Sequence, residues 1–450
     1  MKKRNDEIKI KIIFASFFII IISMISIIIY KTYAFYKVEE NYDVIKAKIG
    51  DFRGTTVNYT YYIDDNIVDD IPTKGQYKYI ASTCDNATLT WNEETWLPEI
   101  NSAQEYRVNC NIVFTEIYDL YEKIKSQSIG LDTVVGLNYD EISSDTNGKG
   151  VYETKDTDSG KSVYFYRGDI DNNNIIFGGF CWKIVRTTET GGIKLIYNGK
   201  PVVNKCSIEL GADTHIGKSQ FNTANGDNAY VGYMYGTSGS TNYDATHENK
   251  NESVIKQKID LWYENNLNNY ENYIEDAVYC NDRSTIKYDS NKILNFSSYG
   301  NLGYGTNNTL YSASARGWAN SINTMPTLKC KLINDRFTVN GENGNGSLKY
   351  PIATITIDEI IYAGLTGGYS IKSTNSINTN FYLYNNVTYW TMTPIASRSD
   401  YTGIARLRLD GYTDYNATNM YYAIRPVISL KNGSKVTGLG TIDNPYELIY

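Results

Sequence analysis

The chain has 450 residues, more than one hydrophobic core usually holds, so we expect two or more folded units. Its 42 Tyr against 13 Phe suit β-structure and half-apolar surfaces better than a dry helical core. The formal net charge is −7, and because the first eleven residues contribute +3, residues 12–450 carry −10, an acidic balance that argues against a nucleic-acid partner.

Residues 12–30, IIFASFFIIIISMISIIIY, contain no charged side chain. At about 1.5 Å per residue they extend roughly 28 Å, close to the hydrocarbon thickness of a bilayer. Lys and Arg are concentrated in residues 1–11, which predicts a single-pass anchor with a cytoplasmic N-terminal tail. The lipid bilayer would then hold residues 12–30, residues 31–53 would form a stalk, and the C-terminal ectodomain would lie outside the cell membrane. A signal peptide cleaved after Ala34 and a buried soluble helix are the alternatives.

All six cysteines follow this segment, and none forms a C-x-x-C motif, which argues against a structural zinc site. Outside the cytoplasm we expect them to be oxidised. Pairing between neighbours in the sequence keeps each disulfide within one predicted unit: Cys84–Cys110, Cys181–Cys206 and Cys280–Cys330. Each closed loop would stabilise its unit by about 3–4 kcal/mol in the chain-entropy model. Free buried thiols are the alternative.

Residues 54–114 alternate between apolar and polar side chains, as in TVNYTYYI and EYRVNCNIVF, and predict a small all-β domain of the sandwich type. An irregular spacer is the alternative. Residues 115–150 predict a helix followed by a polar linker, because Ile117, Leu120 and Ile124 fall on one helical stripe.

Residues 151–434 predict the distal domain. Four strands are expected in KSVYFYR, NIIFGGF, CWKIVRT and IKLIYNG, and further strands in FYLY, VTYWTM, GIARLRLDG and MYYAIRPVISLK. Helices are expected in ESVIKQKIDLWYENNL and after the capping box Thr356-Ile-Asp-Glu359, the second ending at Gly367-Gly368. Residues 435–450 are expected as a C-terminal extension.

The ordered motifs FGGFCWKIVRTTETGGIKLIYNG, ESVIKQKIDLWYENNL, CNDRS, YPIATITIDEIIYAG, YWTMTP and AIRPVISLK resemble a domain-of-unknown-function family of surface proteins in low-GC Gram-positive bacteria. The closing motifs are also similar to the C-type-lectin-like fold of formylglycine-generating enzymes and of the variable proteins of diversity-generating elements. This resemblance implies an α+β, C-type-lectin-like distal domain in which Trp182 and Trp390 are structural residues. The enzymes of that fold hold copper with two late cysteines. Cys330 is the last cysteine here and its nearest predecessor is Cys280, which argues against that activity.

Arg425 and Pro426 interrupt the strand-like run YYAIRPVISLK. A terminal strand with one unpaired edge would accommodate the proline. The arginine would then point inward and require a cluster of carboxylates or carbonyls, for which Asp410, Asp358 and Glu359 are candidates. A plain surface arginine is the alternative.

The sequence offers little for catalysis. His215 and His247 are the only histidines, 32 residues apart in a Gly- and Asn-rich region, and no G-x-S-x-G motif appears. We therefore expect no catalytic residue, cofactor or metal. Calcium held by Asp410, Asp414 and Asn416 is an alternative.

The segment from Ser397 to Tyr422 mixes Tyr, Asn, Asp, Ser and Thr, the composition of binding surfaces. By the resemblance, the ligand-binding residues would be Arg398, Tyr401, Tyr412, Tyr415, Asn416 and Tyr421. The predicted function is non-catalytic recognition or adhesion at the cell surface, with an extracellular glycan or protein as partner. A structural envelope scaffold is the alternative, and an enzyme is the third.

Overall fold

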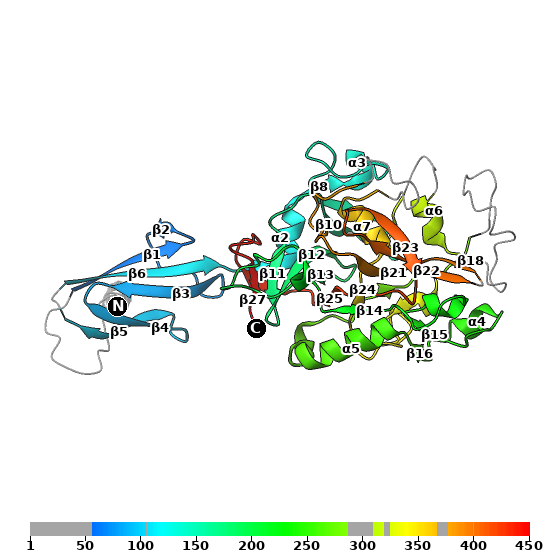
Figure 1. Cartoon of the computed structure of the whole chain (residues 1–450). Coiled ribbons are helices and arrows are strands. Elements are labelled where there is room, and N and C mark those ends of the chain that lie inside the picture. The colour runs from blue at the N-terminus through cyan, green and yellow to red at the C-terminus, as the bar shows by residue number, and fades with distance from the viewer. Residues whose placement is uncertain (1–55, 105–106, 287–308, 319–324, 367–376, 399) are drawn as a thin grey trace, which may run out of the picture. The chain divides into compact units, whose positions relative to one another are not determined.

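The computed structural model describes residues 56–104, 107–286, 309–318, 325–366, 377–398 and 400–450. The chain divides into two compact units, with the boundary between Thr115 and Glu116 (Figure 1). Among the described residues, 27 strands stand against six α-helices, so both units are built mainly of β-sheet.

The predicted fold class, α+β with a C-type-lectin-like domain and an N-terminal transmembrane helix, needs correction: the described chain is mostly β-sheet and contains no helix able to cross a membrane, although its mixture of helices and sheets is roughly compatible with α+β. The described helices are short, and the longest of them, α5 (Val254–Asn266), has 13 residues. In the part of the chain that the structure describes, no helix combines the length and the apolar character needed to cross a bilayer. The predicted anchor over residues 12–30, with its tail and stalk, lies outside the described residues.

The first unit holds a four-stranded sheet and a hairpin. The sheet has the order β2-β1-β6-β3, and β1 runs parallel to β6. The alternating sequences of β1 and β6 place one set of side chains inward, where Ile112 and Phe114 pack with Trp91 of the hairpin. The sheet strands are β1 (Thr56–Ile63), β2 (Asn66–Val68), β3 (Tyr77–Cys84) and β6 (Arg107–Glu116), and the hairpin strands are β4 (Ala87–Asn92) and β5 (Leu97–Ala103).

Three disulfides confirm the predicted connectivity, Cys84–Cys110 in the first unit and Cys181–Cys206 and Cys280–Cys330 in the second. The first two close loops of nearly equal length, with sequence separations of 26 and 25. Loop closure by these two disulfides should therefore contribute similarly to the stability of the two units, and Cys280–Cys330 adds to the second.

Replacing both Cys84 and Cys110 with Ser is expected to lower the free energy of unfolding of the first unit by about 3 kcal/mol. Differential scanning calorimetry of the full chain would show one transition shifted and the other unchanged. The matched pair of changes at Cys181 and Cys206 should move the other transition by a similar amount. Equal shifts of both transitions in either variant would contradict independent units.

The second unit contains a large sheet of eleven strands. Its main path is β20-β25-β13-β12-β11-β27-β26-β7, and β10, β9 and β8 extend from β12. The buried strands are almost continuously apolar, as expected for a sheet covered on both faces. The strands are β7 (Tyr118–Asp119), β8 (Ser128–Leu131), β9 (Gly150–Thr154), β10 (Val163–Arg167), β11 (Asn174–Phe177), β12 (Phe180–Thr187), β13 (Ile193–Tyr197), β20 (Ala353–Thr354), β25 (Pro426–Leu430), β26 (Lys435–Thr437) and β27 (Tyr446–Leu448).

A six-stranded sheet shares the core of this unit, with the order β14-β24-β21-β22-β23 and β18 beside β21. Its strands are β14 (Lys218–Ser219), β18 (Thr309–Leu310), β21 (Tyr389–Arg398), β22 (Tyr401–Leu407), β23 (Thr413–Ala417) and β24 (Tyr422–Ala423). Two short pairs complete the strands, β15 (Met234–Tyr235) with β16 (Asn251–Glu252) and β17 (Tyr279–Cys280) with β19 (Arg336–Phe337). Trp182 and Trp390 are fully buried, and their indole N–H groups donate to the carbonyls of Phe177 (3.0 Å) and Ser219 (2.9 Å).

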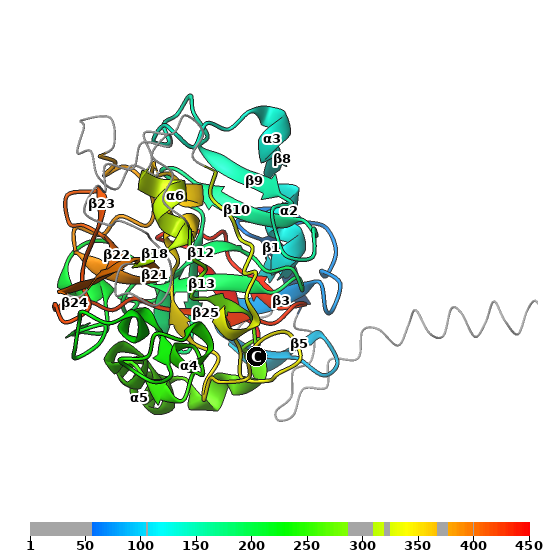
Figure 2. The ribbon, with the colours of Figure 1, turned by 90° about the vertical axis from the view of Figure 1, so that its right-hand side faces the viewer.

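Several of the helices begin at a residue whose side chain caps them. Asp119 caps α2, Ser253 caps α5, and the predicted capping box of Thr356 and Glu359 opens α7. Figures 1 and 2 place α5 and α3 at opposite edges of the second unit. The remaining helices are α2 (Leu120–Ser126), α3 (Asp132–Val135), α4 (Tyr243–Thr246), α6 (Ser312–Trp318) and α7 (Ile357–Ala363), and the 3-10 turns are η2 (Ala212–Thr214), η3 (Asn228–Val231), η4 (Asn268–Tyr273) and η5 (Ile333–Asp335).

Several boundaries differ from those predicted. Helix α7 ends at Gly364 instead of Gly367-Gly368, and FYLY over residues 381–384 forms turns instead of a strand. Residues 115–150 contribute β7, α2, β8 and α3 to the second unit, and residues 435–450 contribute β26 and β27 to the large sheet. Short strands at both ends of this unit carry too few residues for their own periodicity to be recognised.

Arg425 and Pro426 have a different setting from the one predicted. Strand β25 has neighbours on both sides, β13 and β20, so it is not an edge strand. The proline is tolerated because it is the first residue of the strand. Arg425 points inward, where carbonyl and amide oxygens surround it, and none of the three carboxylates proposed for it is its partner.

Candidate functional site

Three neighbouring strands of the large sheet present a row of polar side chains. Arg186 of β12 pairs in register with Lys194 of β13, which pairs with Ser429 of β25. Residues opposite one another in adjacent strands project to the same face. Lys194 and Ser429 are buried, so this row forms a polar floor beneath the surface of the unit.

Glu359 in the first turn of α7 supplies the counter-charge to the two cations of this floor. Its Oε1 atom accepts from Arg186 Nε (2.8 Å) and from Lys194 Nζ (2.5 Å), while Oε2 accepts from the backbone N–H of Thr356 (3.0 Å). The carboxylate is therefore both the acid of a capping box and the partner of two cations. Its side chain is 1 % exposed, so water does not compete for these bonds.

Glu359 and Lys194 differ in how strongly each side chain keeps its charge at neutral pH. Burial alone would raise the pKa of Glu359, but Lys194 and Arg186 outweigh it and hold this pKa at about 2. Burial lowers the pKa of Lys194 to about 8, since the attraction of Glu359 only partly offsets the loss of water. Glu359 is ionised at neutral pH, and Lys194 holds its proton less firmly than an ordinary lysine.

A second ion cluster forms one wall. Arg316 of α6 holds Asp358 through Nε (2.8 Å) and Nη2 (2.9 Å), and the same Nη2 atom reaches Asp282 at 3.1 Å. The backbone N–H of Thr327 also donates to Asp358 (3.1 Å). Asp358 and Glu359 are adjacent in α7 yet serve different cation clusters.

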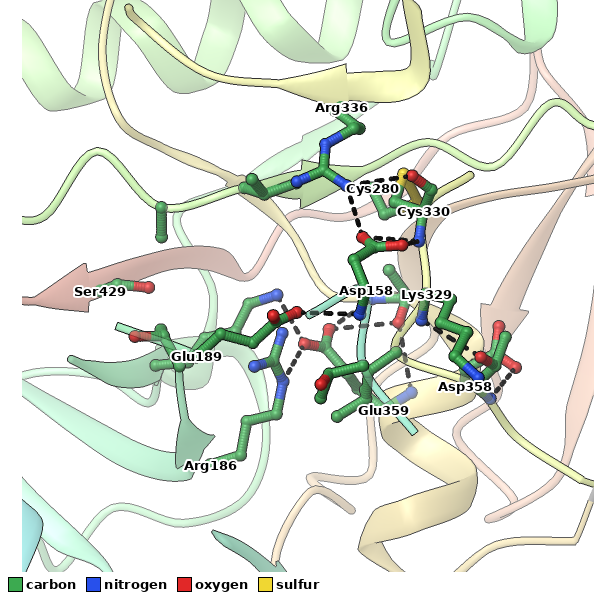
Figure 3. Close-up of a pocket in the computed structure, with 18 of the residues that line it drawn as sticks. Asp158, Arg186, Glu189, Cys280, Lys329, Cys330, Arg336, Asp358, Glu359 and Ser429 are labelled. Carbon is green, nitrogen blue, oxygen red and sulfur yellow. Dashed lines mark hydrogen bonds and ion pairs between the residues drawn. A yellow bond between two sulfur atoms is a disulfide. The ribbon is translucent and has the colours of Figure 1, made fainter. Parts of the chain in front are cut away.

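The Cys280–Cys330 disulfide lies beside a third cluster (Figure 3). The backbone N–H of Cys330 donates to both carboxylate oxygens of Asp158 (3.1 and 3.0 Å), and Arg336 Nη1 donates to the same carboxylate (2.6 Å). Arg336 is the strand partner of Cys280 in the pair β17–β19. The disulfide therefore links Cys330, whose backbone binds Asp158, to Cys280, whose strand partner Arg336 also binds Asp158.

Three further carboxylates line the space between these clusters. Glu275 accepts from the hydroxyls of Thr188 (3.1 Å) and Thr190, and burial raises its pKa. Asp276 accepts from two backbone N–H groups, each at 2.7 Å. Glu189 accepts from the backbone N–H groups of residues 158 (3.1 Å) and 159 (2.9 Å).

Together these groups enclose a cavity of about 400 Å³. This volume lies in the range of small-ligand sites. Both signs of charge line it, and none of the described residues that line it is Phe, Tyr or Trp. Because the charged side chains are fixed by partners, the cavity can hold a small polar group without reordering its own walls.

The six predicted ligand-binding residues lie elsewhere, and the structure does not bring them onto one face. Tyr401 and Tyr415 pack ring to ring on one face of the β22–β23 hairpin (5.5 Å), and the Arg398 guanidinium lies 5.4 Å from the Tyr401 ring. Asn416 faces the other side, where its amide donates to the Tyr422 hydroxyl (2.7 Å). Tyr412 is buried at the hairpin turn, and Tyr421 is 63 % exposed. None of the six lines the cavity.

The carboxylates suggested for calcium are engaged by arginines. Asp414 binds Arg406 and Arg408, and Asp410 binds Arg408. Over the described ranges, no group of three or more His, Cys, Asp or Glu side chains is arranged to hold a metal ion. His247 stacks on Tyr243, and burial lowers its pKa to about 3.

The sequence interpretation did not find the cavity. The available signal was the presence of charged residues inside apolar strand patterns, Arg186 in CWKIVRT and Lys194 in IKLIYNG. A buried charge requires a partner, but Glu359 was recognised only as a capping residue and as a candidate partner of Arg425.

Comparison with known proteins identifies no relative. No family model, no curated protein and no solved structure matches the chain. The resemblance to a surface-domain family stays a prediction, and function has to be argued from the cavity itself.

Proposed function

We propose that this protein is a non-catalytic recognition protein that works outside the cytoplasm and binds the polar end of a peptide or glycan chain in the cavity of its second unit. The observation that carries this proposal is the cavity of about 400 Å³, lined by charges of both signs, most of which are held in ion pairs. Fixed charges recognise a polar ligand at a low entropic cost.

The three disulfides support a location outside the cytoplasm. Disulfides form and persist in oxidising compartments, whereas cytosolic thiols are kept reduced. All six cysteines of the chain are used in this way, which matches a chain that folds in an oxidising space.

Binding is favoured over catalysis because Glu359, the acid that contacts the floor, already accepts hydrogen bonds from other groups of the protein. Glu359 accepts from two cations and from the backbone, which leaves it poorly placed to take a proton from a substrate. The ion pairs would serve to hold the ligand-contacting walls in place.

The cavity can be blocked from its exposed rim. Asn343 lines the cavity, is exposed, and contacts Arg336 only through its backbone carbonyl among the described contacts. Asn343→Trp should therefore close the entrance without disturbing the core, and we expect loss of at least about 90 % of binding on a glycan and peptide array. The neighbouring exposed Glu342 does not line the cavity, so Glu342→Trp is the matched control.

The array also tests the tyrosine-rich segment. If Tyr421→Ala abolishes binding and Asn343→Trp does not, the ligand binds at that segment and the cavity assignment fails. If the wild-type chain binds nothing on the array and self-associates in solution, the scaffold alternative replaces recognition.

Hydrolysis is the second candidate function. Asp282 and Asp358 both line the cavity and both contact Nη2 of Arg316, so two carboxylates lie close together in one recess. Cleavage of an array ligand, abolished by Asp282→Asn, would favour this candidate over non-catalytic recognition.

A further inference from the structure

We propose that the group bound in this cavity is a primary ammonium of a peptide, carried by a lysine side chain or a free N-terminus. This inference rests on the proposed recognition function and assigns its ligand class. The geometry that carries it is a set of three carboxylates that form no ion pair within the described residues, beside a buried hydroxyl that makes no hydrogen bond within them.

Four of the seven carboxylates that line the cavity face a cation, in the pairs Asp158 with Arg336, Asp282 and Asp358 with Arg316, and Glu359 with Arg186 and Lys194. The other three form no ion pair among the described residues. Within the described residues, Glu189, Glu275 and Asp276 accept only from hydroxyls and backbone N–H groups. Partly buried anions are costly without a counter-charge, so this side of the cavity favours a cationic ligand.

Ser429 gives an independent indication at the same place. Its side chain is fully buried and lines the cavity (Figure 3). Its hydroxyl lies near the Tyr279 hydroxyl but makes no hydrogen bond of normal geometry with the described residues. The backbone of Ser429 accepts from the backbone N–H of Glu275 (2.7 Å), which places the two residues side by side. A buried polar group without a partner costs free energy, and a ligand N–H donor would satisfy it.

The Glu275 carboxylate is already held for such a contact. Thr188 and Thr190 donate one hydroxyl to each of its oxygens, and the two hydroxyls lie 2.8 Å apart. Gly192 permits this position, because a Cβ atom at residue 192 would overlap Oε2 of Glu275. Each carboxylate oxygen keeps lone-pair capacity for a further donor.

The residues that line the cavity also favour one class of cationic ligand over others. Quaternary ammonium ligands are typically bound by aromatic cages, and sugar rings by aromatic faces, but no aromatic side chain is among the described residues that line this cavity. A primary ammonium has three N–H donors, which suit several separate oxygen acceptors. A peptide amine therefore fits better than an amino sugar.

Isothermal titration calorimetry of the full chain tests this assignment with four probes. These are a blocked tripeptide with a central lysine, the same peptide with acetylated lysine, an unblocked trialanine amide and a glucosamine oligomer. We expect the two ammonium peptides to bind, and acetylation and Glu275→Gln each to weaken binding about tenfold or more. Asp276→Asn is a second variant in case Glu275→Gln alters the fold.

A control variant sharpens the test. The exposed Glu271 does not line the cavity, so Glu271→Gln should bind like the wild type.

The outcomes separate this inference from the proposed function. If Asn343→Trp blocks an anionic or neutral array ligand that Glu275→Gln still binds, the ammonium assignment is overturned while recognition in the cavity stands. Binding of the glucosamine oligomer without either peptide overturns the peptide assignment. Absence of any bound ligand on the array overturns both.

Discussion

Replacing Glu359 with Gln is expected to lower the free energy of unfolding of the second unit by about 3–5 kcal/mol at pH 7. The change keeps the shape of the side chain but removes the anion that faces Arg186 and Lys194. Arg186 and Lys194 would then lie together without a counter-charge. In the wild type, the Glu359 and Lys194 side chains are only 1 % and 2 % exposed, so water cannot replace the lost anion. Breaking a buried ion pair at one partner costs much more than never forming it, because the remaining charge stays buried.

The control is Glu122→Gln. Glu122 pairs with Lys125 on the exposed face of α2, where its side chain is 62 % exposed. Such surface pairs contribute about 0–1 kcal/mol. Denaturant unfolding of both variants should therefore separate them clearly, and equal small losses would show that the floor does not depend on the Glu359 charge.

The wild type and Glu359→Gln also differ in a pH dependence whose direction can be predicted. The pKa of Glu359 is held at about 2, below its ordinary value of 4.5. A carboxyl whose pKa is depressed in the folded state contributes its full stability above the unfolded value and loses it as the pH falls through the folded value. The stability difference between wild type and Glu359→Gln should therefore shrink as the pH is lowered from 4.5 to about 2. A difference that stays constant over this range would contradict the charge-based explanation.

Local features of the fold could be predicted from the sequence because the residues that create them are close together. The capping box of Thr356 and Glu359 spans three residues, and the buried stripe of α5 over Ile255 and Ile259 repeats within one turn. The disulfides follow the same rule, since each joins cysteines that are neighbours in the order of the chain.

The cavity could not be predicted because its contacts join distant segments. Glu359 and Arg186 are 173 residues apart, and Arg336 and Asp158 are 178 apart. Charge alone does not identify such partners among the 43 Lys and Arg and 50 Asp and Glu of the chain. The fold class was wrong for a related reason: helical stripes were visible in the sequence, but the pairing of many short strands depends on distant partners.

Arg425→Met is expected to destabilise the second unit by about 3–6 kcal/mol, because it removes three donors from a site that water does not reach. Arg425 is fully buried, and it donates to Tyr197 O (3.0 Å), Leu383 O (2.8 Å) and Asn198 Oδ1 (2.8 Å). Its guanidinium also lies 5.0 Å from the Tyr389 ring. These acceptors belong to two segments that are distant in the sequence, residues 197–198 and residue 383, so one side chain joins them.

The opposing effect is the cost of burying the cation, which lowers the pKa of Arg425 and which methionine would remove. We expect the loss of hydrogen bonds to dominate. Two of the acceptors are main-chain carbonyls, which a side-chain substitution cannot replace with apolar groups, and buried acceptors without donors keep their full desolvation cost. Arg425→Lys should recover only part of the stability, since an ammonium does not reproduce the planar fork that reaches three directions. Calorimetry of the full chain, read at the unfolding transition of the second unit, decides between the two effects. The exposed Lys431→Met is the control. An unchanged transition in Arg425→Met would mean that the three oxygens do not need this arginine.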